Sequence, residues 1–133
     1  MQLVLLRDTM SVNCFYSTYH ERNGSYLERE NEPEKFYYLS DLCDVSFNFF
    51  STEFDALIKE LEIVLHEAYL ADDLEIALHI MEIIVLAKFC IFNENKYALE
   101  FTPWGSVKEL KKMPKHLARN LSGLVKFLTK EKE

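Results

Sequence analysis

The stretch from Ile76 to Phe92 is the most apolar part of the chain and limits the available folds more than any other feature. Its apolar run is broken by His79, Glu82 and Lys88, whereas a membrane-spanning helix needs about 20 mostly apolar residues. On a helical wheel the apolar side chains cover most of the circumference and leave Glu75, His79 and Glu82 as a narrow polar stripe. We therefore predict a helix at the centre of a protein core.

A second helix is predicted directly before this one. Apolar residues recur with helical spacing at positions 54, 57, 58, 61, 64, 65 and 68. Asp72 followed by Glu75 has the spacing of a capping box, so we expect a break at 70–72 and a new helix from about residue 73. Glu62 and His66 lie opposite the apolar side of the first helix and are expected to face water.

The N-terminal part of the chain has the composition of a β-sheet. Strands are expected over residues 2–7, 12–19, 36–39 and 45–49. Asn23-Gly24 is a strong signal for a two-residue hairpin turn, which predicts a hairpin over about 12–30. Residues 28–34 contain no apolar side chain and are expected to form a solvated loop.

The region after the central helix is predicted to contain a small hairpin and two helices. Asn93-Glu94-Asn95 separates residues 90–92 from 96–101, which is typical of a hairpin. Pro114 interrupts the helical pattern, so a short helix near 106–112 should precede a longer one. The longer helix is amphipathic, with basic side chains opposite a stripe of apolar ones. We predict a single α+β domain over residues 1–133: an N-terminal antiparallel sheet packed on two central helices, with a small hairpin and a C-terminal amphipathic helix.

The sequence lacks the residues that several classes of function require. The three glycines are isolated, so no phosphate-binding loop, dinucleotide fingerprint or nucleophile elbow is present. Cys14, Cys43 and Cys90 are odd in number and widely spaced, which indicates neither disulfides nor a zinc site. The apolar start meets Arg7 too early for a signal peptide. These features favour a protein of the reducing cytoplasm.

Five potential metal ligands lie on the two central helices, in positions that favour solvated faces over a metal site. They are Glu62, His66, Glu75, His79 and Glu82. Di-iron sites in helix bundles use Glu-x-x-His motifs, and this chain has none. We predict no metal and no cofactor.

Charge is divided unevenly along the chain. The formal net charge is −7, but residues 1–102 carry 7 basic and 19 acidic side chains and residues 103–133 carry 8 basic and 3 acidic ones. Nucleic-acid binding needs a positive surface that releases phosphate counterions. Nucleic acid is therefore an unexpected partner, except through the basic C-terminal helix.

The densest group of acids lies next to aromatic residues that could anchor a protein partner. We predict a contact surface for a basic protein that comprises Glu28, Glu30, Glu32, Glu34, Tyr37, Tyr38, Asp41 and Asp44. Aromatic anchors give an interface affinity, and surrounding charges steer the encounter. The carboxylates would stand in for nucleic-acid phosphates.

In size and charge the chain is similar to small acidic inhibitors of basic toxins or nucleases, such as bacterial immunity proteins and phage-encoded anti-defence proteins. This resemblance implies a non-enzymatic protein-binding module that blocks its partner by occlusion. The function expected from the sequence is therefore that of a small acidic inhibitor without a catalytic site.

Two alternatives remain open at this stage. The chain could be a secretion-type chaperone or structural subunit that forms a homodimer through apolar helix surface. It could also be a small hydrolase that uses His20 and His116, because general acid–base catalysis needs two such groups near one substrate.

Overall fold

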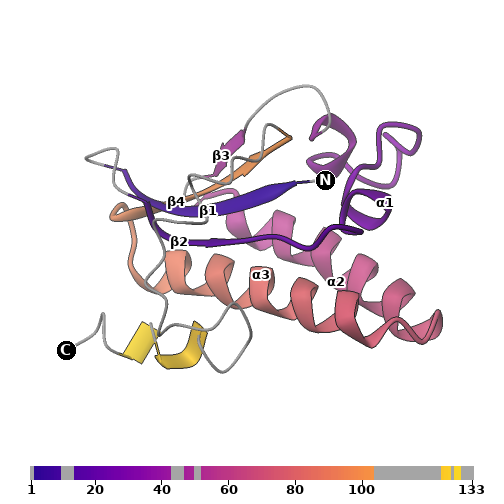
Figure 1. Ribbon diagram of the computed structural model, residues 1–133. Coiled ribbons are helices and arrows are strands. Elements are labelled where there is room, and N and C mark those ends of the chain that lie inside the picture. Colours follow the sequence, from indigo (N-terminus) through magenta and orange to yellow (C-terminus); the bar gives the residue numbers. More distant parts are fainter. Residues whose placement is uncertain are drawn as a thin grey trace.

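A computed structural model describes residues 2–9, 14–42, 47–49, 52–103, 124–126 and 128–129. In chain order its elements are β1 (Leu3–Asp8), β2 (Cys14–Thr18), α1 (Gly24–Leu27), the 3-10 helix η1 (Leu39–Asp41), β3 (Phe47–Phe49), α2 (Phe54–Leu70), α3 (Leu74–Phe92) and β4 (Tyr97–Thr102). Residues 124–126 and 128–129 are helical and belong to the C-terminal helix. The predicted α+β class is confirmed (Figure 1). The boundary of a single domain over 1–133 stays a prediction.

The sheet has four strands in the order β2-β1-β4-β3, and every neighbouring pair is antiparallel. β1 and β4 form the central pair, in a register that places Leu3 opposite Thr102 and Asp8 opposite Tyr97. The sheet therefore combines N-terminal strands with one strand that follows both long helices.

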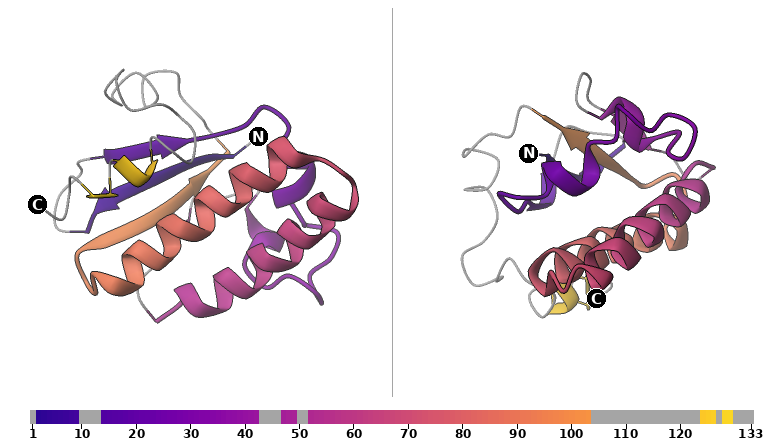
Figure 2. Two further views of the ribbon diagram at one scale, coloured as in Figure 1. Left: turned by 90° about the horizontal axis from the view of Figure 1, so that it is seen from below. Right: turned by 90° about the vertical axis from the view of Figure 1, so that its right-hand side faces the viewer.

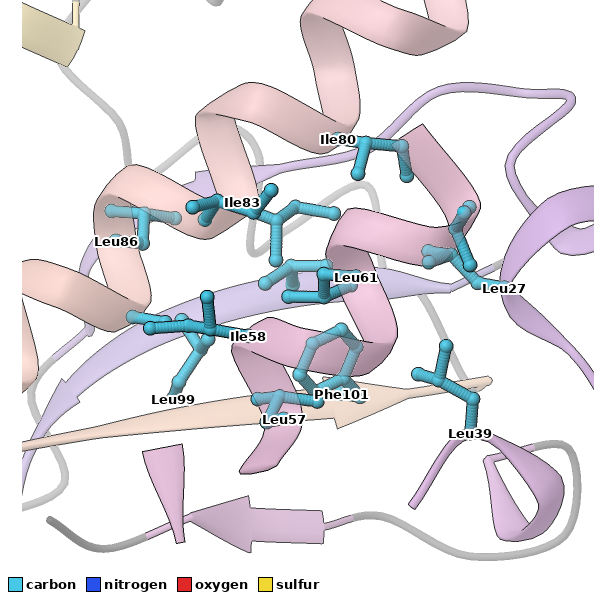
Figure 3. Close-up of a cluster of buried hydrophobic side chains, with 14 of the residues drawn as sticks. Leu27, Leu39, Leu57, Ile58, Leu61, Ile80, Ile83, Leu86, Leu99 and Phe101 are labelled. Carbon is cyan, nitrogen blue, oxygen red and sulfur yellow. The ribbon is translucent and has the colours of Figure 1, made fainter. Parts of the chain in front are cut away.

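The helices α2 and α3 lie side by side and cover one face of the sheet (Figures 1 and 2). Their apolar sides, the inner face of the sheet and the segment before β3 form one core. Figure 3 labels members of this core: Leu27, Leu39, Leu57, Ile58, Leu61, Ile80, Ile83, Leu86, Leu99 and Phe101. Leu124 of the C-terminal helix is buried in the same core, and the described residues of this helix lie beside α3 on the side away from α2 (Figure 2). The predicted packing of sheet on helices is thus observed.

The predicted break between the central helices is confirmed. α2 ends at Leu70, and Asp73 caps α3 by accepting a hydrogen bond from the Ile76 backbone N–H at 3.4 Å. Asp72 between them has a φ of 58°, a left-handed conformation that aspartate tolerates better than most residues. The break lies where it was predicted, but the capping residue differs: the capping box predicted Asp72 as the cap, whereas Asp73 caps α3.

The hairpin predicted over 12–30 is wrong, because β2 pairs with β1 and residues after Asn23 form α1. The buried Asn23 side chain pairs instead with the backbone of Gln2. Its Oδ1 accepts from the Gln2 N–H and its Nδ2 donates to the Gln2 carbonyl, both at 2.8 Å. The amide thus acts as a partner for the start of β1, and Asn23 is not a turn residue.

The strand predicted over 36–39 is also wrong. Phe36 and Leu39 are both buried in the core, and η1 begins at Leu39. A strand would send residues of odd separation to opposite faces, whereas this irregular segment sends both toward α2 and α3. The strand predicted over 45–49 is confirmed for Phe47–Phe49.

The hairpin predicted over 90–101 is wrong in its first half. α3 continues to Phe92 because Phe89 and Cys90 are still buried against the core. The chain then turns at Asn93–Asn95 into β4, whose partners are β1 and β3. The turn was placed correctly, but it joins a helix to a strand.

Within the described residues, no helix is both long and apolar enough to cross a membrane. The short helix predicted near 106–112 and the first part of the helix predicted from about 114 lie outside the described residues.

Candidate functional site

The predicted contact surface falls on one irregular segment, residues 28–42, which we call the acidic loop. It runs between α1 and β3 and includes η1. Phe36, Leu39 and Leu42 are fully buried in the core and fasten the loop at three points. Apolar residues at irregular spacing therefore hold a segment that has no regular secondary structure over most of its length.

Arg29 is the main polar anchor inside the loop, and its side chain is only 9% exposed. Its guanidinium donates to the Tyr26 carbonyl at 2.5 Å, to Glu32 at 3.0 Å and to Glu67 of α2 at 2.9 Å. The same group lies 4.7 Å from the centre of the Phe36 ring, within the range of a cation–π contact. One side chain thus ties the start of the loop to α2.

Glu67 receives a second hydrogen bond from this loop, donated by Lys35 at 3.2 Å. Burial alone would raise the pKa of Glu67. The hydrogen bonds from Arg29 and Lys35 have the larger combined effect, so the pKa lies below its usual value. Both basic side chains of the loop are therefore engaged with α2.

Glu60 anchors the second half of the loop. Its carboxylate accepts the backbone N–H groups of Tyr38 and Leu39, each at 3.1 Å. These N–H groups lie at the start of η1, so Glu60 satisfies donors that have no partner within the helix. This role was not predictable from the sequence, because Glu60 is more than 20 residues away along the chain and a glutamate in a helix is expected on a solvated face.

The predicted contact residues separate into an exposed and an engaged group. The exposed group, which we call the acidic–aromatic surface, comprises Glu30, Glu34, Tyr37 and Asp41. Glu28 accepts a hydrogen bond from the Gln2 amide at 2.9 Å, and Glu32 is paired with Arg29. Tyr38 is half-buried, and burial raises its pKa. Asp44 lies outside the described residues.

A buried polar layer between α3 and the sheet was not predicted. Glu82 is buried and accepts hydrogen bonds from the Tyr16 hydroxyl at 2.9 Å and from the Thr18 hydroxyl. Burial raises the pKa of Glu82, although these two hydrogen bonds oppose the shift. The solvated face expected for His79 and Glu82 is therefore wrong, because both side chains are buried and Glu82 faces strand β2.

His79 belongs to the same layer and is also buried. Burial, assisted by the charge of His20, lowers its pKa to about 4, so the ring is neutral at pH 7. Its Nε2 lies 3.1 Å from the Asn23 Nδ2, which is a donor, and its Nδ1 lies 3.8 Å from Glu82. We assign the proton to Nδ1 from this network, so the contact with Glu82 is not an ion pair.

A charged cluster at the N-terminus of α3 lies beside this layer. Arg22 donates to Asp73 at 2.5 Å and to Glu75 at 3.2 Å, and His20 lies 3.2 Å from Glu75. The hydrogen bond from Arg22 is the main cause that lowers the pKa of Asp73 to about 2. The cluster joins the segment after β2 to α3, which indicates a structural role for His20. His116, the second histidine of the hydrolase hypothesis, lies outside the described residues.

An open groove runs between α2 and α3 on their outer side, with a volume of about 550 Å³. Its apolar lining comprises Leu65, Tyr69, Leu74, Ala77, Leu78 and Met81, and its polar lining is Glu62 and His66. Leu74 is 57% exposed and Leu78 is 53% exposed, so the groove includes large apolar side chains that remain in contact with water. Glu62 and His66 are exposed, as predicted.

No group of three or more metal-ligating side chains occurs in the part of the chain that the structure describes. Cys90 is buried, and burial raises the pKa of its thiol to about 12, which makes it a poor nucleophile. Cys14 is half-buried and Cys43 lies outside the described residues.

Comparisons with known proteins give no relative: no protein-family model, no curated protein and no solved structure matches this chain.

Proposed function

We propose that the chain is a non-enzymatic protein-binding module, a small acidic inhibitor that occludes a basic protein partner such as a nuclease toxin. The acidic–aromatic surface would form the contact. The observation that carries the proposal is Tyr37, whose side chain is 76% exposed although the residues at positions 36 and 39 are fully buried. An aromatic ring presented on an anchored loop is the kind of residue that dominates binding energy at interfaces.

The anchoring of the loop supports this proposal because binding costs less when the contact residues are already ordered. Arg29 and Glu60 fix the backbone on both sides of Tyr37. The ring also packs edge-on against Tyr38, with the ring centres 4.9 Å apart. Tyr37 would therefore lose little conformational freedom when a partner covers it.

The charge of the loop supports a basic partner. Residues 28–42 contain five acidic and two basic side chains, and both basic ones contact Glu67. Glu30, Glu34 and Asp41 are left at the surface. Carboxylates in this arrangement would speed the encounter with a basic protein and weaken binding as salt is added. A reducing cytoplasm is the expected compartment.

The experiment compares two charge-reversal variants that change the net charge equally. A tagged chain is used to capture partners from its native host, and each captured protein is identified by mass spectrometry. Glu30→Lys with Glu34→Lys should abolish capture of a basic partner, whereas Glu21→Lys with Glu94→Lys, at exposed positions elsewhere, should preserve it. Tyr37→Ala should weaken binding by about tenfold or more, as expected for an aromatic anchor.

Three results would overturn the proposal. The contact surface is wrong if the partner is captured equally by the wild type and the Glu30/Glu34 variant. The inhibitor function is wrong if the partner is acidic, or if its binding is unchanged between about 0.1 M and about 1 M salt, where surface charges become strongly screened.

The alternative function, a subunit or chaperone that forms a homodimer through apolar helix surface, is favoured by one observation. Tyr69, Leu74 and Leu78 are more than half exposed on the outer side of α2 and α3. A dimeric mass in solution that becomes monomeric in Leu78→Asp would favour this function over the inhibitor.

A further inference from the structure

We propose that His79, Asn23 and Gln2 form a pH-sensitive latch, which closes the base of the acidic loop while His79 is neutral and opens when its ring takes up a proton. The latch is a chain of hydrogen bonds that joins α3 to the residue before α1 and to the residue before β1. It belongs to the free chain and does not depend on the partner of the proposed function.

Gln2 joins the two ends of the acidic loop. Its side-chain Nε2 donates to the Glu28 carboxylate at 2.9 Å and to the Leu42 carbonyl at 3.0 Å, and Gln2 is fully buried. Glu28 and Leu42 are the first and last residues of the loop. The backbone of Gln2 is in turn held by the Asn23 side chain through two hydrogen bonds of 2.8 Å. Release of Asn23 therefore frees the residue that closes the loop at its base.

The two bonds to Gln2 fix the orientation of the Asn23 amide. Its oxygen accepts the Gln2 N–H and its nitrogen donates to the Gln2 carbonyl, so the two ends of the amide cannot be exchanged. The nitrogen of this amide also faces Nε2 of His79, at 3.1 Å. Because a donor lies opposite it, Nε2 must be the acceptor and carries no proton. The closed latch thus requires a neutral His79 ring.

A proton on Nε2 of His79 would set two donors against each other. Asn23 can accept from the charged ring only if its oxygen turns toward the ring, and that turn gives up both hydrogen bonds to Gln2. The amide can therefore serve Gln2 or a charged His79, but not both. This makes Asn23 an element with two states, and protonation of the ring shifts the balance between them.

Glu82 does not hold a second proton on the His79 ring. It lies 3.8 Å from Nδ1, which carries the proton of the neutral ring, whereas the added proton sits on Nε2. The Tyr16 and Thr18 hydroxyls of β2 already donate to this carboxylate. Burial raises the pKa of Glu82, so its negative charge is lost early as the pH falls.

The other charged groups near His79 belong to the cluster at the N-terminus of α3. The ring centre of His20 lies 6.1 Å from that of His79, and His20 contacts Glu75. Arg22 pairs with Asp73 and Glu75. Burial, together with the charge of His20, lowers the pKa of His79 to about 4 from its usual 6.5. Opening that exposes the ring to water therefore becomes more favourable as the pH falls below 6.5.

Hydrogen exchange at Gln2, followed by NMR and corrected for the intrinsic rate at each pH, measures how often the latch opens. In the wild type, protection of the Gln2 backbone amide should fall by about tenfold or more between about pH 7.5 and about pH 5. The Gln2 side-chain protons, which contact both ends of the loop, should lose protection over the same range. His79→Gln should remove this pH dependence because glutamine does not titrate. His20→Gln, the matched control at the neighbouring ring, should keep it.

Urea separates opening of the latch from unfolding of the whole protein. Local opening exposes little surface, so exchange at Gln2 should hardly change at low urea concentrations. Exchange at Leu61, which is fully buried in the core on α2, should become faster under the same conditions.

The variant Asn23→Ala gives a second test that does not depend on the folding of His79→Gln. It removes the amide between the ring and Gln2, so the Gln2 amide should be unprotected at every pH. The pKa of His79, followed by NMR titration of its ring, should rise from about 4 because the donor opposite Nε2 is gone. Circular dichroism establishes that each variant keeps its fold.

Several results would exclude the latch. These are equal protection of Gln2 at both pH values, a fall in protection that persists in His79→Gln, and a fall that disappears in His20→Gln. Exchange of Gln2 and Leu61 at one rate with one urea dependence would show that protonation unfolds the whole protein. An unchanged pKa of His79 in Asn23→Ala would exclude the amide as the link between the ring and the loop.

Discussion

The carboxylate of Glu60 accepts the backbone N–H group of Tyr38 through both of its oxygens, each at 3.1 Å. One of these oxygens also accepts the N–H group of Leu39. A side chain of α2 therefore holds the backbone on which the exposed Tyr37 is presented.

Replacement of Glu60 should loosen the acidic loop. Glu60→Ala removes the acceptor for two backbone donors, so we expect the free energy of unfolding to fall by about 2 kcal/mol. Glu60→Gln keeps one carbonyl oxygen and should lose less. Urea unfolding measures both values, and hydrogen exchange at Tyr38 and Leu39 should speed up in the alanine variant. Unchanged exchange at both amides would contradict the anchoring role.

Arg29 should be irreplaceable by lysine. The guanidinium donates in three directions, to Tyr26, Glu32 and Glu67, and a single ammonium group lacks this geometry. Arg29→Ala should cost about 2 kcal/mol, because the Tyr26 carbonyl and the partly buried Glu67 carboxylate lose a charged donor. Arg29→Lys should recover less than half of that loss.

The matched control for Arg29 is Lys35→Ala, which removes the second partner of Glu67 from an exposed position. We expect a loss of about 0.5 kcal/mol or less for this variant. The pKa of Glu67, followed by NMR titration, should rise in both variants and more in Arg29→Ala. Equal losses in the free energy of unfolding of the two variants would show that the burial of Arg29 adds nothing to stability.

Asn23 distinguishes the observed fold from a hairpin turn. In a hairpin turn Asp-Gly is nearly as favourable as Asn-Gly, so Asn23→Asp would be tolerated. In the structure the Asn23 amide donates to the Gln2 carbonyl and faces Nε2 of His79, so aspartate would bury a charge and lose both donors. We expect a loss of about 3 kcal/mol, measured by thermal or urea unfolding. The same change at exposed Asn31 should stay within about 0.5 kcal/mol.

His79 should make the protein less stable in mild acid. Its pKa is about 4 in the folded protein and 6.5 when unperturbed, so between these values the unfolded chain binds a proton that the folded chain does not. The free energy of unfolding should therefore fall by as much as about 2 kcal/mol from pH 6.5 to pH 4.5. Urea unfolding at several pH values measures this slope.

The variant His79→Gln tests whether His79 causes this loss of stability in mild acid. Glu82 titrates with the opposite sign, because its raised pKa means that the folded protein takes up its proton first as the pH falls. Without the histidine, stability should fall much less between pH 6.5 and pH 4.5 than in the wild type, because the lowered pKa values of Glu67 and Asp73 then act against the raised pKa of Glu82. A variant that keeps the slope of the wild type would place the acid sensitivity elsewhere.

The central helices were predictable from the sequence because two local signals agreed. Apolar spacing defined the buried side of α2, and the pair Asp72 and Glu75 marked the break between the helices to within one residue of the observed cap, Asp73. Local hydrogen bonds and a continuous apolar side are sufficient to define such elements.

The predictions that failed concern residues whose conformation depends on contacts with distant parts of the chain. Asn23 has the local signature of a turn, but its amide is used by Gln2, which is 21 residues away. Phe36 and Leu39 resemble a strand locally, but the core formed by α2 and α3 takes both side chains into an irregular loop. Glu82 is a polar residue on a helix, and only the approach of Tyr16 and Thr18 explains its burial. Helical periodicity predicted the side of α3 on which Glu82 lies, but it could not predict that β2 covers this side.

The pairing of Leu3 with Thr102 places β1 beside β4, although both long helices are synthesised between these two strands. β1 and β2 can meet early, but the other edge of β1 stays unpaired until both long helices and β4 have been synthesised. During that interval an apolar edge that includes Val4 and Leu6 is open to any strand that approaches it. We therefore expect the nascent chain to depend on early formation of the α2–α3 hairpin, which can shield the inner face of β1 before its final partner arrives.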